Sequence, residues 1–172
     1  MNPIEVFIEM DQLVTSLIDT FRGIPAELLV FLISLLPLLE LRGGILAAGL
    51  LHVGMVKAFL LCLAGTLLPV PFILLFFRKI LEWLRNTGFV RLVRRLEDKM
   101  NRKSKQIEKY KTFGLLLFVA VPLPGTGAWT GSAAAALMGM RFRDALLSVA
   151  LGCVVADAIM CLLAYGVLGS IW

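Results

Sequence analysis

Charged residues are scarce in most of this sequence, and their scarcity argues against a soluble protein. Only 17% of the 172 residues are charged, 59% are hydrophobic, and the mean hydropathy is +0.90. Uncharged runs occupy residues 58–77 and 112–140, and about 20 apolar residues suffice to cross the hydrocarbon core of a bilayer. The composition therefore indicates an all-α integral membrane protein.

The residue types that most enzymes and metal sites use are also few. The sequence has one histidine, His52, and three cysteines that lie in apolar runs without CxxC spacing: Cys62, Cys153 and Cys161. No Ser–His–Asp set, phosphate-binding Gly-Lys motif or dinucleotide fingerprint is present. We therefore expect no catalytic residues, no cofactor and no metal site. The cysteines should be buried as small hydrophobic residues, and His52 should lie at the membrane interface.

Residues 1–25 lack the basic segment that opens a cleavable signal, so we expect them to remain in the protein. Their apolar residues recur at helical spacing, whereas Glu5, Glu9, Asp11 and Asp19 fall on other faces. This pattern predicts an amphipathic N-terminal helix that lies on the membrane surface or against the other helices.

Basic residues are concentrated in 78–111, which holds twelve Lys and Arg against four acidic residues. Apolar residues between Phe89 and Met100 repeat at helical spacing, which predicts an amphipathic helix in the centre of the chain. Basic connectors of membrane proteins stay in the cytoplasm, and they can also contact anionic lipids. No aromatic interleaving or nucleic-acid motif accompanies the charge, so we expect no nucleic-acid partner.

The uncharged run 112–140 is interrupted at its centre by prolines and glycines. Irregular backbone at membrane depth is tolerated only where protein or a water-filled cavity surrounds it, and such a break in a transporter points to a binding site. The backbone groups, the hydroxyl groups and the indole of this loop are therefore site candidates. They belong to Pro122, Pro124, Gly125, Thr126, Gly127, Trp129 and Thr130.

A second interruption divides residues 28–56 into two halves, each too short to cross a bilayer alone. The two halves form either one tilted, interrupted span or a re-entrant hairpin that enters and leaves by the same side. We favour the hairpin, because the break falls near the middle and carries two charges, Glu40 and Arg42.

The two hydrophobic halves of the chain resemble each other. Pro37-Leu38 and Gly54-Met55 match Pro122-Leu123 and Gly139-Met140 at an offset of 85, and Ala58, Leu60 and Gly65 match Ala145, Leu147 and Gly152 at an offset of 87. The chain then divides into an N-terminal helix (1–25), a first repeat (26–77), a basic connector (78–111) and a second repeat (112–172). Two hairpin-plus-span repeats would insert with opposite orientation. If the broken segments cross fully, the fold is instead a four-helix bundle.

Three charged residues fall at membrane depth, where a charge usually faces a cavity or a partner. Glu40 and Arg42 form a substrate or proton site, or a structural ion pair, or they lie at the membrane interface if the hairpin is shallow. Asp157 lies near the middle of the last apolar run. It is either protonated, paired with Arg42, or a carboxylate that couples transport to protons.

Two stretches carry a resemblance to a known family. Glu40-Leu-Arg-Gly-Gly44 and Pro122-Leu-Pro-Gly-Thr-Gly-Ala-Trp-Thr-Gly131, with its alanine-rich sequel, resemble the two signatures of the small multidrug export protein family. The resemblance covers roughly residues 26–170. This family is similar in architecture to the DedA superfamily, which implies re-entrant hairpins and either lipid-carrier translocation or proton-coupled transport.

Together these features predict a small transporter of the inner membrane that is coupled to protons. It would move a small molecule or lipid-like substrate through a site between two facing hairpin tips. Two spans and two hairpins make a thin wall, so we expect a homodimer or larger assembly among membrane lipids. The alternatives are a lipid flippase or scramblase of DedA-like architecture, and a membrane scaffold that transports nothing.

Overall fold

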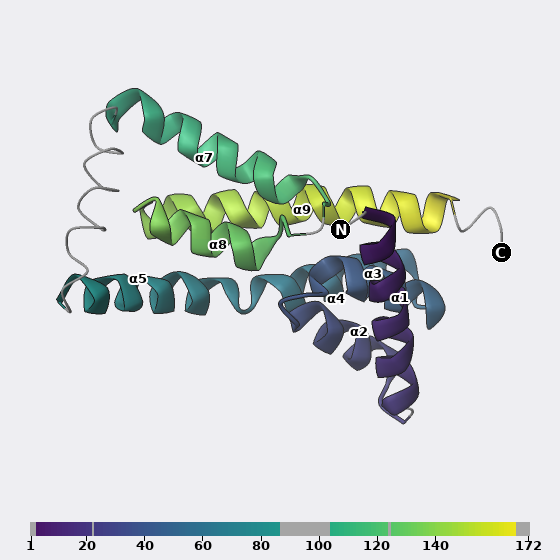
Figure 1. The fold of residues 1–172 in the computed structure, drawn as a ribbon. Helices are drawn as coiled ribbons and strands as arrows, with labels where there is room; N and C mark the ends of the chain where they lie inside the picture. Colours follow the sequence, from purple (N-terminus) through teal and green to yellow (C-terminus); the bar gives the residue numbers. More distant parts are fainter. Residues whose placement is uncertain (1–2, 22, 87–103, 124, 168–172) are drawn as a thin grey trace.

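The computed structural model describes residues 3–21, 23–86, 104–123 and 125–167, and within these ranges the regular secondary structure is α-helical (Figure 1). The all-α prediction is confirmed for this part of the chain. The helices are α1 (Pro3–Thr20), α2 (Ala26–Leu35), α3 (Glu40–Leu50), α4 (Met55–Leu67), α5 (Val70–Asn86), α7 (Ser104–Ala120), α8 (Ala128–Leu137) and α9 (Phe142–Val167).

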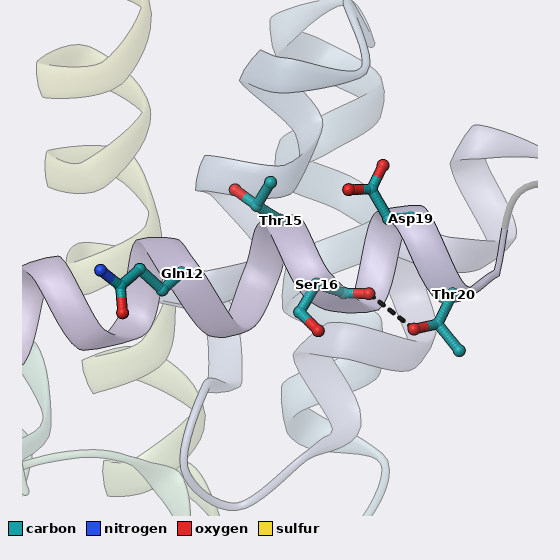
Figure 2. Close-up of a pocket in the computed structure, with 5 residues that line it drawn as sticks. All are labelled: Gln12, Thr15, Ser16, Asp19 and Thr20. Carbon is teal, nitrogen blue, oxygen red and sulfur yellow. Dashed lines mark hydrogen bonds between the residues drawn. The ribbon is translucent and has the colours of Figure 1, made fainter.

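The N-terminal helix is amphipathic, as its sequence pattern predicts. Val14 is fully buried, and Leu17 and Ile18 pack against the core, where α1 contacts α3. A polar strip on α1 lines an open depression and carries a hydrogen bond from the Thr20 hydroxyl to the Ser16 carbonyl (Figure 2). The residues that line it are Gln12, Thr15, Ser16, Asp19 and Thr20. Because they all belong to one helix, the depression is the polar face of α1 and not a cavity between helices.

Two helical stretches in the described ranges are long and apolar enough to cross a membrane, Met55–Phe77 and Phe142–Gly166. They correspond to the two spans that the hydropathy predicts. The first runs from α4 into α5 through a turn at Leu68 and Pro69, since proline cannot donate a backbone hydrogen bond to the helix. The second, α9, is unbroken and runs along α7 and α8 (Figure 1).

Both predicted interruptions are breaks between two helices, but the first lies earlier than predicted. Glu40 and Arg42, which were expected in the break itself, belong to the start of α3. A turn at 36–39 separates α2 from α3, and these two helices pack against each other and against α4. Irregular backbone around residues 121–127 separates α7 from α8. The helix pairs are compatible with hairpins, but their entry into and exit from one side of a bilayer stays a prediction.

At both ends of the basic connector 78–111, the described residues belong to helices that extend into the neighbouring segments. Helix α5 continues from the first span to Asn86, and α7 begins at Ser104, within the predicted connector, and continues into the second broken segment. The amphipathic helix predicted between Phe89 and Met100 lies outside the described residues.

The two halves share the same close packing. In the first half Ser34 of α2 lies between two glycines, because a Cβ on Gly44 would meet its Oγ at 1.9 Å and a Cβ on Gly65 would meet its Cβ at 2.9 Å. In the second half Val119 of α7 lies between Gly131 and Gly152 in the same way, at 2.5 and 2.8 Å. The glycines thus allow three helices to approach closely in each half.

The turns that follow α3 and α8 also match, bond for bond. The amide of Val53 donates to the Ala48 carbonyl at 2.9 Å, and that of Met140 donates to the Ala135 carbonyl at 3.1 Å. In each turn one residue has a left-handed backbone, His52 with φ 54° and Gly139 with φ 63°. All these matches have an offset of 87.

The sequence alignment of Gly54-Met55 with Gly139-Met140 is therefore wrong. Gly54 has φ −59° and precedes α4, whereas Gly139 supplies the left-handed residue of its turn, so the two glycines have different roles. The extra residues of the second half lie in its broken loop, 121–127, which is longer than the turn 36–39. Before the loop the offset is 85, and after it the offset is 87.

Each short helix also packs against the long helix of the other half. Helix α3 contacts α9, and α8 contacts α5. This exchange brings the start of α3 to the start of α8, where the candidate site residues lie.

Candidate functional site

Glu40 is the residue that joins the two broken segments. It is the first residue of α3, its side chain is only 6% exposed, and its Oε1 accepts a hydrogen bond of 3.0 Å from the Trp129 amide in the first turn of α8. The first amides of a helix have no partner within it, and the helix dipole favours negative charge there. The carboxylate of one half therefore stabilises the helix start of the other half.

The backbone of Glu40 is itself unusual. Its φ is 47°, a left-handed conformation that costs roughly 1–2 kcal/mol for a residue with a side chain. Such a conformation persists only where the surrounding structure holds it. The bond to Trp129 is one of the contacts that hold Glu40 in place.

Gly127 makes the approach of Glu40 possible. A Cβ atom on Gly127 would lie 1.7 Å from Oε2 of Glu40 and 2.5 Å from its carboxyl carbon. No other residue type leaves room for the carboxylate at this point. The sequence predicts Gly127 as a site residue through its backbone groups, whereas the structure shows that its missing Cβ leaves room for the carboxylate.

Arg42 forms the second connection between the halves. Its side chain is 7% exposed, and its Nη2 donates to the Thr126 carbonyl and, at 3.2 Å, to the Thr126 hydroxyl. Among the described residues, no carboxylate lies within ion-pair distance of this guanidinium. Two of the alternatives left open by the sequence, an ion pair of Arg42 with Asp157 and one of Arg42 with Glu40, are therefore wrong.

Thr126 also fixes the shape of its own loop. Its hydroxyl lies 2.7 Å from the Val121 carbonyl and 2.9 Å from the Leu123 carbonyl, and it accepts the Leu123 amide at 3.2 Å. The Thr130 hydroxyl accepts the amide of Gly127 at 3.0 Å. Both predicted hydroxyl groups thus hold the backbone of the loop and of the α8 start.

For the other predicted loop residues, the structure shows exposure and backbone conformation but no side-chain hydrogen bond among the described residues. Pro122 is half-buried, and Gly125 is exposed with a left-handed φ of 85°. Trp129 is half-buried, and its indole Nε1 is buried without a hydrogen-bond partner. Pro124 lies outside the described residues.

Asp157 lies on α9 and forms no described hydrogen bond or ion pair with Glu40 or Arg42. It is fully buried; its Oδ2 has no hydrogen-bond partner, and its Oδ1 lies 4.0 Å from the Cys161 thiol. All three cysteines are buried and free, as predicted. Within the described part of the chain, no group of three His, Cys, Asp or Glu side chains is placed to hold a metal ion.

The family comparison bears directly on this site. The family model described as "Putative small multi-drug export protein" matches residues 40–159, which begin at Glu40 and include the whole 122–131 stretch, with the end of the broken loop and the start of α8. The chain belongs to this family. Comparison with curated proteins and with solved structures gives no match.

Membership confirms the family resemblance that the two signatures carry, while the relation to the DedA superfamily stays a prediction. The family name denotes export and not an enzyme. Together with the two apolar helical stretches, it identifies this chain as a membrane protein.

Proposed function

We propose that this family member is a small membrane transporter whose substrate site lies where the starts of α3 and α8 meet. The observation that carries the proposal is the pair of contacts from Glu40 to Trp129 and from Arg42 to Thr126. Buried charges and broken helices are both costly in a membrane, and in transporters they mark the substrate pathway. Here both features occur at one point.

The two halves would insert into the membrane with opposite orientation, each as a re-entrant hairpin followed by a span. This arrangement is supported by the repeated packing of Ser34 and Val119 and by the exchange in which α3 packs on α9 and α8 on α5. Contacts of this reciprocal kind are expected between repeats related by a two-fold axis. The two helix starts would then face each other near the middle of the bilayer.

Asp157 is the proposed coupling residue. Its Oδ2 has no hydrogen-bond partner in the described part of the chain. This oxygen is therefore available to bind and release a proton as the surrounding helices move. Intramembrane carboxyl groups serve as proton carriers in many transporters. No described hydrogen bond or ion pair joins Asp157 to Arg42, so the proton site and the substrate site would use different groups.

In the inner membrane, the basic segment 78–111 would lie on the cytoplasmic side, as the distribution of positive charge indicates. A second copy of the chain would complete the wall of the pathway. Residues with exposed apolar side chains, such as Leu60, Leu147 and Leu162, would then face lipid or this second copy.

The test is transport by the purified protein in lipid vesicles under an imposed proton gradient. We expect the gradient to drive flux of small fluorescent solutes, and Glu40→Gln to reduce it. Glu27→Gln is the matched control, because Glu27 also lies at a helix start but is exposed and pairs with Lys57 at 3.4 Å. Lipid flip without solute flux would replace the transporter with a flippase. The absence of both activities would leave a scaffold.

A further inference from the structure

The position that Glu40 occupies is a binding site for a carboxylate group. A carboxylate sits on the first-turn amide of Trp129, close to that of Ala128, in space that Gly127 leaves open. In this structure the ligand belongs to the protein itself. The contact pairs a negatively charged acceptor with the positive end of a helix, which is the chemistry that binds free anions.

Arg42 provides an independent indication of an anionic ligand. Its side chain is more than nine-tenths buried, yet its described hydrogen bonds come only from Nη2 and go only to the neutral oxygens of Thr126. The Nη1 and Nε donors bond to nothing in the described part of the chain. Guanidinium groups bind carboxylates through two parallel donors, so Arg42 has an unused edge of the type that a carboxylate needs.

The charges around this point favour an anion over a cation. A cation here would meet a buried guanidinium and the positive end of α8, and the Glu40 carboxylate is the one acidic group among the described contacts of this point. An anion would meet the same two positive groups, and in the described part of the chain the acidic group that contacts this point and would oppose an anion is Glu40. Movement of the Glu40 side chain away from α8 would remove that opposition and relieve the need for its left-handed backbone.

We propose that the substrate of this site carries a carboxylate, which displaces Glu40 from the α8 start and pairs with Arg42. The inference rests on the proposed transport function and names its substrate class. Glu40 then acts as a resident ligand that keeps the site closed when the substrate is absent.

The test is direct binding to the purified full-length protein in detergent. Trp129 is made the sole fluorescent reporter by Trp83→Phe and Trp172→Phe, and the probes are benzoate, inorganic phosphate and tetraphenylphosphonium. We expect saturable binding of benzoate, about tenfold tighter in Glu40→Gln because the repelling charge is removed. Glu27→Gln should bind as the parent does.

Arg42→Gln should abolish benzoate binding. Arg42→Lys should keep the fold but weaken binding, because a point charge replaces the two parallel donors. Benzoate binding that neither Arg42→Gln nor Arg42→Lys weakens would overturn the proposal. So would tighter binding of phosphate than of benzoate, or binding of tetraphenylphosphonium that Glu40→Gln weakens.

This experiment also separates the site from the transport function. Benzoate binding without flux in vesicles would refute transport and leave the carboxylate site standing. Flux of other solutes without benzoate binding would refute the carboxylate site and leave transport standing.

Discussion

The Glu40 carboxylate accepts a hydrogen bond of 3.0 Å from the Trp129 amide, which lies 89 residues further along the chain. The bond joins the first residue of α3 to the first turn of α8. Since each helix follows a break in an apolar segment, one contact links both interruptions. Changes on either side of it should therefore affect the same activity.

Gly127→Ala should reduce solute flux in vesicles by about tenfold or more. The new Cβ would overlap Oε2 of Glu40, and loss of a charge-assisted hydrogen bond costs roughly 1.5–3 kcal/mol. Gly114→Ala is the control, because nothing lies within 4 Å of a Cβ at that exposed glycine of α7. Equal flux in both variants would show that the position of Glu40 does not matter for transport.

Asp157→Asn should leave solute binding intact but make transport independent of the proton gradient. The amide has nearly the same shape as the carboxyl group but cannot take up and release a proton in this pH range. Flux is measured with and without the gradient, and Asp144→Asn on the exposed start of α9 is the control. A response to the gradient that survives in Asp157→Asn would remove this residue from the coupling mechanism.

Labelling of single added cysteines should report the orientation of the two halves. In the hairpin arrangement, Thr20→Cys reacts with a membrane-impermeant maleimide from outside the cell and Arg143→Cys reacts from the cytoplasm. A four-helix bundle gives the opposite pattern at both positions. Both residues are exposed, and the three native cysteines are buried.

Gly65→Ala and Gly152→Ala should each lower the thermal stability of the detergent-solubilised protein. A Cβ at these positions would lie 2.6 Å from the Phe31 carbonyl and 2.9 Å from the Leu116 carbonyl, and forced overpacking costs about 1–3 kcal/mol. Unfolding is followed by gel filtration after heating. Gly49→Ala, which meets nothing within 4 Å, should match the parent. Unchanged stability in Gly65→Ala would contradict the close helix approach described here.

The sequence predicts the helical class, the two spans and both interruptions, because long uncharged runs and clustered Pro and Gly have direct local consequences. It also predicts Glu40 and Arg42 as site candidates, since charges are rare at membrane depth. None of these inferences needs knowledge of how helices pack.

The partners of those charges depend on packing and could not be predicted. Charge complementarity suggests an ion pair between Arg42 and Asp157. In the structure, Arg42 instead donates hydrogen bonds to the neutral oxygens of Thr126. Which residues meet is decided by the contacts of α3 with α9 and of α8 with α5, between segments far apart in the chain. The left-handed backbone of Glu40 likewise could not be predicted. Glycine is the residue that usually adopts this conformation, but the nearby Gly43 and Gly44 are helical and the left-handed residue is a glutamate.

The matched packing of the two halves limits how alike their sequences can be. Gly44 and Gly131 occupy matching positions in the two halves. The residues four positions before them are Glu40 and Gly127, so Glu40 contacts the residue that corresponds to it in the other half. A chain with glutamate at both positions would press two carboxylates into the space of one. A chain with glycine at both would leave the helix starts without a ligand. Divergence at this one pair of positions is therefore built into the contact, and two identical half-length chains could not reproduce it.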